Sequence, residues 1–212
     1  MKKLITLALA VLSLAAVAAF GASEAKALNP TQTDVVTIVN TVYWDLDQFW
    51  GAPTHKPGVG YYDYVADGRL VNYQTECGST ANNIGYQGFY CAGGHIYLDY
   101  NQQRGHVANI GDGAVALWLA HEYGHSAEWL RSLNWPAPYH ELLADCFAGL
   151  YFRWGVYSSG KLAYNDYLEA RTMLSRMGTD AAHGGPAQRL RAFDYGFNRV
   201  GWTSCTAGWQ YW

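Results

Sequence analysis

The sequence predicts an α+β fold, in which one helix-dominated domain carries a small antiparallel sheet ahead of its central helix. Two observations lead to this prediction. Five stretches carry apolar residues at helical spacing, and the stretch 58–94 is rich in Gly, Tyr and Asn with short extended segments. Because the chain has no repeats, linkers or low-complexity runs, we expect a single domain.

The N-terminus has the layout of a secretory signal peptide. Two lysines precede an apolar run from about Leu4 to Phe20, and small residues follow as far as Ala27. Cleavage after Ala27 would define residues 1–27 as the signal peptide and 28–212 as the mature domain, secreted or otherwise extracytoplasmic. The apolar run is slightly long for such a peptide, so an uncleaved N-terminal anchor is the alternative. No later run is long enough to cross a membrane.

The charge balance excludes one class of partner. Loss of residues 1–27 removes three lysines and one glutamate, which moves the net charge from -3 to -5 and leaves 185 of the 212 residues. A mildly acidic chain without clusters of Lys or Arg offers no surface for a nucleic-acid backbone. We therefore expect no nucleic-acid partner.

The four cysteines all lie in the mature part, which suits an oxidising compartment and predicts two disulfides. Three pairings can be drawn. The simplest joins Cys77 to Cys91 around a Gly- and Asn-rich loop and leaves Cys146 to pair with Cys205. A cysteine zinc site has no CxxC spacing to support it.

Taken in order, the first predicted helix lies within 29–51 and stops at a Gly-Ala-Pro sequence. The segments "RLVNY", "GFYC" and "HIYLDY" follow as short strands. A long central helix then begins near Asp112 and ends by about Asn134, because two prolines follow it. The remaining helices are predicted at 139–155, 164–178 and 185–199.

The central helix carries the sequence "HEYGH". On an α-helix His121 and His125 lie about 40° apart and one turn along the axis, so both imidazoles can reach one ion. In this HExxH arrangement the neutral imidazoles bind Zn²⁺, and Glu122 accepts a proton from water that the metal activates. The alternative is a pair of histidines that belong to the core of a buried helix.

A zinc site of this kind needs a third protein ligand. The metzincin pattern is excluded because Glu128 and Arg131 occupy the positions of its glycine and its third histidine. On the next helix, Glu141 and Asp145 share one face, so Glu141 can complete a His₂Glu site and Asp145 can accept the second ring N–H of a ligand histidine. His140 is the rival third ligand, but it lies about 100° off that face.

Several blocks in order along the chain resemble the bacterial neutral zinc metallopeptidases, a family of the gluzincin type. They are "CGST", "GFYC", "IYLDY", "LAHEYGH", "ELLADCFAG" and "HGGPAQRLRAF", followed by Cys205. The resemblance implies a gluzincin or minigluzincin-like fold with one Zn²⁺ per chain. It implies that His121, His125 and Glu141 bind this zinc.

The same resemblance implies roles for residues around the ligands. Glu122 is expected to be the catalytic base, and Asp145 the partner of a ligand histidine. His183 or Arg189 is expected near the developing oxyanion, unless His183 caps a turn and Arg189 forms a structural ion pair. The "IYLDY" strand is expected to add a substrate backbone to a sheet edge, or else to be an ordinary interior strand.

The chain departs from the family pattern after the HExxH motif and after Cys91. Ser126 and Glu128 stand where the family usually carries a histidine and a glutamine, and Ala-Gly-Gly stands where it carries a proline and an acid. Neither change affects an expected ligand, but both bear on substrate preference.

These observations predict a secreted zinc metalloprotease that acts on a peptide or protein substrate. One alternative is a zinc-stabilised extracellular module whose many Tyr and Trp side chains bind glycan or protein. Another is a zinc hydrolase that acts on cell-wall peptides. The sequence makes no prediction about oligomeric state.

Overall fold

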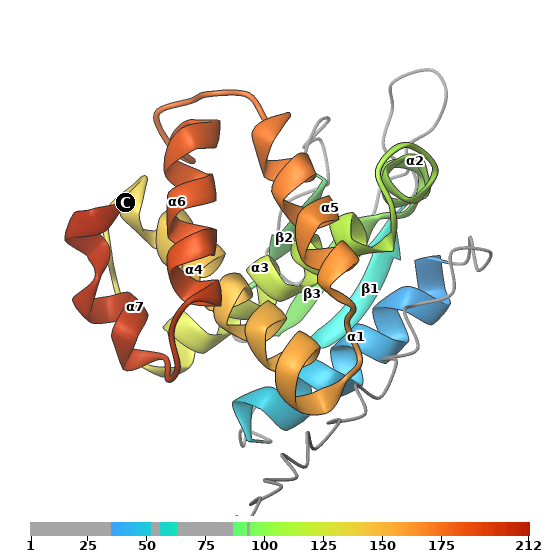
Figure 1. The fold of residues 1–212 in the computed structure, drawn as a ribbon, viewed down its shortest axis with the longest axis horizontal. Coiled ribbons are helices and arrows are strands. Elements are labelled where there is room, and N and C mark those ends of the chain that lie inside the picture. The colour runs from blue at the N-terminus through green and yellow to red at the C-terminus, as the bar shows by residue number, and fades with distance from the viewer. Residues whose placement is uncertain (1–34, 52–55, 63–86, 93) are drawn as a thin grey trace, which may run out of the picture.

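The computed structural model describes residues 35–51, 56–62, 87–92 and 94–212. The elements are α1 (Val35–Trp50), β1 (Gly58–Tyr62), β2 (Gly88–Tyr90), β3 (His95–Asp99), α2 (Tyr100–Asn109), α3 (Asp112–Leu130), α4 (Tyr139–Trp154), a π-helical turn (Gly155–Ser159), α5 (Tyr164–Ser175), α6 (Pro186–Phe197), α7 (Thr203–Ala207) and a 3₁₀ turn (Trp209–Tyr211). Figure 1 shows α3 and α4 at the centre, with the sheet and α1 to one side and α6 and α7 to the other. The helix-dominated α+β character is confirmed.

The sheet is mixed, so the predicted antiparallel sheet was wrong in this respect. Its order is β1-β3-β2, with β3 antiparallel to β2 and parallel to β1. The short turn after Cys91 joins β2 to β3 as a hairpin, which makes that pair antiparallel. A parallel pair needs a connection of a dozen or more residues, and the chain between β1 and β3 is long enough to allow it.

The position of β3 also decides the role of the "IYLDY" segment. The backbone of β3 pairs with β1 along one edge and with β2 along the other. A central strand has no edge left for a substrate backbone, so the strand-addition role expected of this segment was wrong and the interior-strand alternative holds.

Helix α2 and the short helix α7 were not predicted from the sequence. Helix α2 has the polar sequence "YNQQRGHVAN" and buries only Gln103, so it shows no apolar period. It begins because the Asp99 carboxylate, at the end of β3, accepts a hydrogen bond from the backbone N–H of Gln102 at 2.9 Å. The five predicted helices all exist, although α3 ends at Leu130 rather than near Asn134.

Helices α4 and α6 approach closely because each places a glycine against the other's backbone. A Cβ atom on Gly149 of α4 would collide with the carbonyl oxygen of Phe193, and one on Gly196 of α6 would collide with that of Cys146. Removing both side chains lets the two helix backbones pack in direct contact. This contact sets the distance between the polar side chains that the two helices contribute to the site described below.

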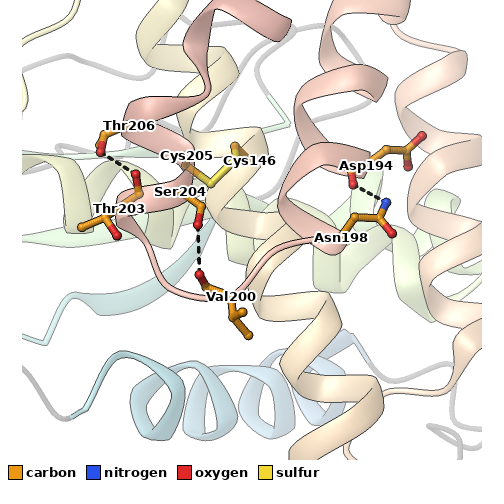
Figure 2. Close-up of a disulfide and its surroundings, with 8 residues drawn as sticks. All are labelled: Cys146, Asp194, Asn198, Val200, Thr203, Ser204, Cys205 and Thr206. Carbon is orange, nitrogen blue, oxygen red and sulfur yellow. Dashed lines mark hydrogen bonds between the residues drawn. A yellow bond between two sulfur atoms is a disulfide. The ribbon is translucent and has the colours of Figure 1, made fainter.

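A disulfide between Cys146 and Cys205 ties α4 to α7, as predicted for this pair (Figure 2). The other predicted pairing, Cys77 with Cys91, includes Cys77, which lies outside the described residues. The predicted signal peptide at 1–27 also lies outside them. Among the helices that the structure describes, none is long and apolar enough to span a membrane.

We expect Gly149→Ala to lower the free energy of unfolding by about 1–3 kcal/mol, because the new methyl group would force α4 and α6 apart. Urea unfolding of purified protein measures this change. The matched control is Gly105→Ala in α2, where an added Cβ meets nothing within 4 Å. There the higher helix propensity of Ala should stabilise the fold by up to about 1 kcal/mol. Equal effects at the two positions would contradict the packing argument.

Candidate metal centre

Helix α3 places His121 and His125 one turn apart on the face that borders a cleft. Their Nε2 atoms are 3.2 Å apart, and the two rings lie edge to face with centroids 4.8 Å apart. His121 is buried, with an exposed fraction of 3%. The sequence places these histidines here because the apolar residues of "ALWLAHEYGH" cover most of α3 and bury it in the centre of the fold.

Helix α4 brings Glu141 to the same point. Its Oε2 atom lies 3.1 Å from Nε2 of His121 and 3.6 Å from Nε2 of His125. Ligands at zinc coordination distances in a tetrahedral site lie about 3.3–3.6 Å from one another, so the three separations are close to those that one ion would impose. These residues form a group that could hold a metal ion.

Asp145, one turn after Glu141 on α4, orients His121. Its Oδ1 atom lies 2.8 Å from Nδ1 of His121, and the side chain is fully buried. Asp145 also accepts two hydrogen bonds from Arg189 of α6, at 2.7 and 2.8 Å, which keep it ionised. An ionised Asp145 accepts the N–H at Nδ1 of His121, so the lone pair of Nε2 faces the cleft.

The donor set therefore fits a cation. Burial lowers the pKa of His121, but the nearby carboxylates of Asp145 and Glu141 outweigh burial and raise it overall. Burial raises the pKa of Glu141, but hydrogen bonds to the histidines outweigh burial and hold it far below its usual range. Two nitrogen lone pairs and one carboxylate oxygen at this separation repel one another unless a proton or a metal ion lies between them.

Glu128 is a neighbour of the site that the sequence marked only as a departure from the family pattern. It lies three residues after His125 on α3, and its Oε1 atom is 3.6 Å from Nδ1 of that histidine. This distance is too long for a hydrogen bond, although Glu128 is buried, with an exposed fraction of 5%. Spacing of i and i+3 on a helix is a local signal that could have identified this pair.

Glu122 lies in the cleft beside the three donors. The cleft has a volume of ≈ 700 Å³ and is lined on one side by β2, where Gly88 lies next to the Glu122 side chain. Burial raises the pKa of Glu122, and Glu141 adds to this, while His121 and His125 oppose it. No hydrogen bond to another described residue engages its carboxylate, so it faces the cleft as a free acceptor.

His183 reaches the cleft from the turn before α6. Asp180 shapes this turn, since its Oδ1 atom accepts the backbone N–H groups of Ala182 and His183 at 2.8 and 2.7 Å. The carboxylate also lies 2.9 Å from Nδ1 of His183, while Nε2 lies 3.8 Å from Oε1 of Glu141. His183 therefore belongs to a turn and also lines the cleft. Asp180 was not identified from the sequence.

Arg189 and His140 occupy supporting positions. All three nitrogens of the Arg189 guanidinium contact protein atoms, namely Asp145, the Nδ1 of His121 at 3.3 Å and the sulfur of Met177 at 3.3 Å. Of the two roles that the sequence suggested for Arg189, these contacts correspond to the structural ion pair. Nε2 of His140 lies 3.1 Å from Oε1 of Glu141, the oxygen that faces away from the other two histidines. His140 is therefore outside the group of three donors.

A second acidic group lies at the start of α3. It comprises Asp112, Asp166 and Glu169, which lie close enough to hold an ion. Backbone N–H groups of Gly113 and Ala163 donate to Glu169 and Asp166 at 2.9 and 2.7 Å. Burial raises the pKa of Asp166 to about 7, so the group can share protons. Hydrogen bonds from backbone N–H groups at the starts of α3 and α5 account for Glu169 and Asp166, and we assign the group no ligand.

Comparisons of the chain with protein-family models, with curated proteins and with solved structures found no match. The chemistry of the site is therefore inferred from its own residues and their geometry.

We expect Arg189→Ala to lower the free energy of unfolding by about 3–5 kcal/mol, because Asp145 would remain as an unpaired buried carboxylate. The matched control is Arg171→Ala, which removes another Arg–Asp pair between helices, at 2.9 Å, whose arginine side chain is 41% exposed. That loss should be below about 1 kcal/mol. Urea unfolding in the presence of a chelator measures both without a contribution from metal. Similar losses would show that Asp145 does not depend on Arg189.

Proposed function

We propose that this protein is a secreted zinc-dependent peptidase of the gluzincin type that hydrolyses peptide bonds in a peptide or protein substrate. One observation carries the proposal. Three donor atoms of His121, His125 and Glu141 converge within 4.8 Å of one another, and the unengaged carboxylate of Glu122 lies beside them in an open cleft. A buried structural zinc site would be enclosed by four protein ligands instead.

Zinc is the metal that this donor set favours. Two imidazoles and one carboxylate are the ligands of catalytic zinc sites that leave a fourth position open, and the carboxylate of Asp145 behind His121 supplies the supporting hydrogen bond typical of them. Zinc in such a site acts as a Lewis acid that polarises a carbonyl group and lowers the pKa of water to about 7. Mg²⁺ and Ca²⁺ prefer oxygen ligands and fit the two imidazoles poorly.

Glu122 is the general base in this proposal. Its carboxylate accepts the proton of the attacking water and later transfers it to the amine that leaves. Burial raises its pKa, which makes the carboxylate a stronger base than an exposed glutamate.

His183 is positioned to stabilise the oxyanion that forms on the carbonyl oxygen. Asp180 holds its Nδ1 nitrogen at 2.9 Å, which leaves Nε2 directed toward the donor group. In its doubly protonated form the ring donates a hydrogen bond from Nε2 to the developing negative charge. In this proposal Arg189 does not contact the substrate; it holds Asp145, which orients His121.

The proposed location rests on two features. The disulfide between Cys146 and Cys205 suits an oxidising compartment. The N-terminal sequence has the layout of a signal peptide.

We expect Glu122→Gln to retain one zinc per chain and to lower kcat by about 10²–10⁴-fold, because the amide cannot accept the proton. Zinc analysis and cleavage of denatured casein and a peptide library, with and without chelator, measure this. His121→Ala and Glu141→Ala are the controls, and both should lose the metal. Full activity of Glu122→Gln would refute the assignment. Zinc without any cleavage by wild type would favour a binding module, and activity on cell-wall peptides alone would favour the cell-wall hydrolase.

We expect His183→Ala to lower kcat by about 10²–10³-fold while zinc content is unchanged, because the oxyanion loses its hydrogen-bond donor. His140→Ala is the matched control, since it removes the other imidazole that contacts Oε1 of Glu141. If the two variants lose activity equally, His183 supports Glu141 and does not contact the substrate. Asp180→Asn should show a smaller loss in kcat than His183→Ala.

A further inference from the structure

A second cavity opens beside the metal-binding cleft, next to the loop between α3 and α4. It has a volume of ≈ 500 Å³, and we call it the flanking pocket. Tyr90, His125 and His140 line both the cleft and this pocket, so the two cavities adjoin one another. A peptide bound across the donor group would therefore pass the opening of the flanking pocket and place one side chain in it.

The walls of the flanking pocket are mainly aromatic and aliphatic. They include Trp129, Leu133, Trp135 and Pro136. The ring of Trp135 is backed by the C-terminal Trp212, with centroids 6.2 Å apart. Such walls can pack against the methylene groups of a long side chain, and the faces of tryptophan rings also attract cations.

One acidic side chain, Glu128, lines this pocket in the described part of the chain. It is 5% exposed, and its Oε1 atom has no hydrogen-bond partner among the described residues. No described lysine or arginine lines the pocket. Arg131, the nearest in sequence, donates to the carbonyl oxygen of Ala127 at 3.1 Å and stacks over Trp50. Nδ1 of His125 lies 3.6 Å from the Glu128 carboxylate, beyond hydrogen-bond distance, and no lysine or arginine of the described residues lines the pocket to pair with it.

We propose that the flanking pocket binds a lysine or arginine side chain of the substrate close to the bond that is cleaved, an inference that rests on the proposed peptidase activity. The methylene groups pack against the tryptophans, and the cationic end forms a charge-assisted hydrogen bond with Glu128. An apolar side chain of the same length would fill the same space but would leave the Oε1 atom of Glu128 without a hydrogen bond, at a cost in binding free energy. The structure thus favours a basic residue over an apolar one.

The first test uses quenched fluorescent peptides in which one position at a time, on either side of the cleaved bond, carries Lys, Arg, norleucine or Glu. At one position, wild type should cleave the Lys or Arg peptide with kcat/KM about tenfold higher than the norleucine peptide. Glu128→Gln should bring this ratio close to one and keep zinc, because the amide is nearly the same size and its oxygen can still face His125. Cleavage without a basic preference at any position would overturn the proposal, as would a preference that Glu128→Gln leaves intact.

The second test separates the pocket from the peptidase activity. Binding of the same Lys and norleucine peptides to metal-free wild type is followed by tryptophan fluorescence, with Glu128→Gln and Trp135→Leu as variants. We expect the Lys peptide to bind about tenfold more tightly to wild type, and both variants to lose most of this difference. Equal binding of the two peptides would refute the pocket. Selective binding in a protein that cleaves nothing would support the pocket and refute the peptidase.

Discussion

The buried carboxylate of Asp145 is the interaction on which the rest of the site depends. It lies on α4, accepts two hydrogen bonds from Arg189 of α6 and orients His121 of α3, so one group joins three helices. A fully buried carboxylate would be very unfavourable by itself. The guanidinium of Arg189 donates to both oxygens of Asp145, so it neutralises the carboxylate and also fixes its orientation. The direction of His121 Nε2 follows from this arrangement.

The packing of α4 against α6 makes that ion pair possible. Gly149 and Gly196 remove two side chains where the helices cross, and the Cys146–Cys205 disulfide holds the segment after α6 against α4. Figure 2 shows the disulfide beside α6, where Asp194 and Asn198 form the last turn. The two glycines have no reactive group, but they determine the distance between Asp145 on α4 and Arg189 on α6. A change of a few tenths of an ångström between the helices would alter both hydrogen bonds from Arg189.

The charged side chains of the cleft and the flanking pocket are mostly carboxylates. Glu122 and Glu141 line the cleft with the two histidines of α3, and Glu128 lines the flanking pocket next to His125. Arg189 is the one lysine or arginine that lines the cleft in the described part of the chain, and Asp145 engages it. The region would therefore favour the two cations proposed above, a metal ion between the donor atoms and a basic side chain of the substrate next to them. The same excess of carboxylates explains why the histidines have raised pKa values despite their burial.

The sequence by itself determined those features that depend on residues close together in the chain. The spacing of His121, Glu122 and His125, the shared face of Glu141 and Asp145, and the five long amphipathic or buried helices all follow from the period of the α-helix, which is a property of the local backbone. Only the tertiary structure decided that β1 pairs in parallel with β3, that Arg189 contacts Asp145, and that Asp180 lies at the site. Those outcomes depend on which surfaces pack together across long separations in the chain, and the local pattern of residues carries no information about such pairings.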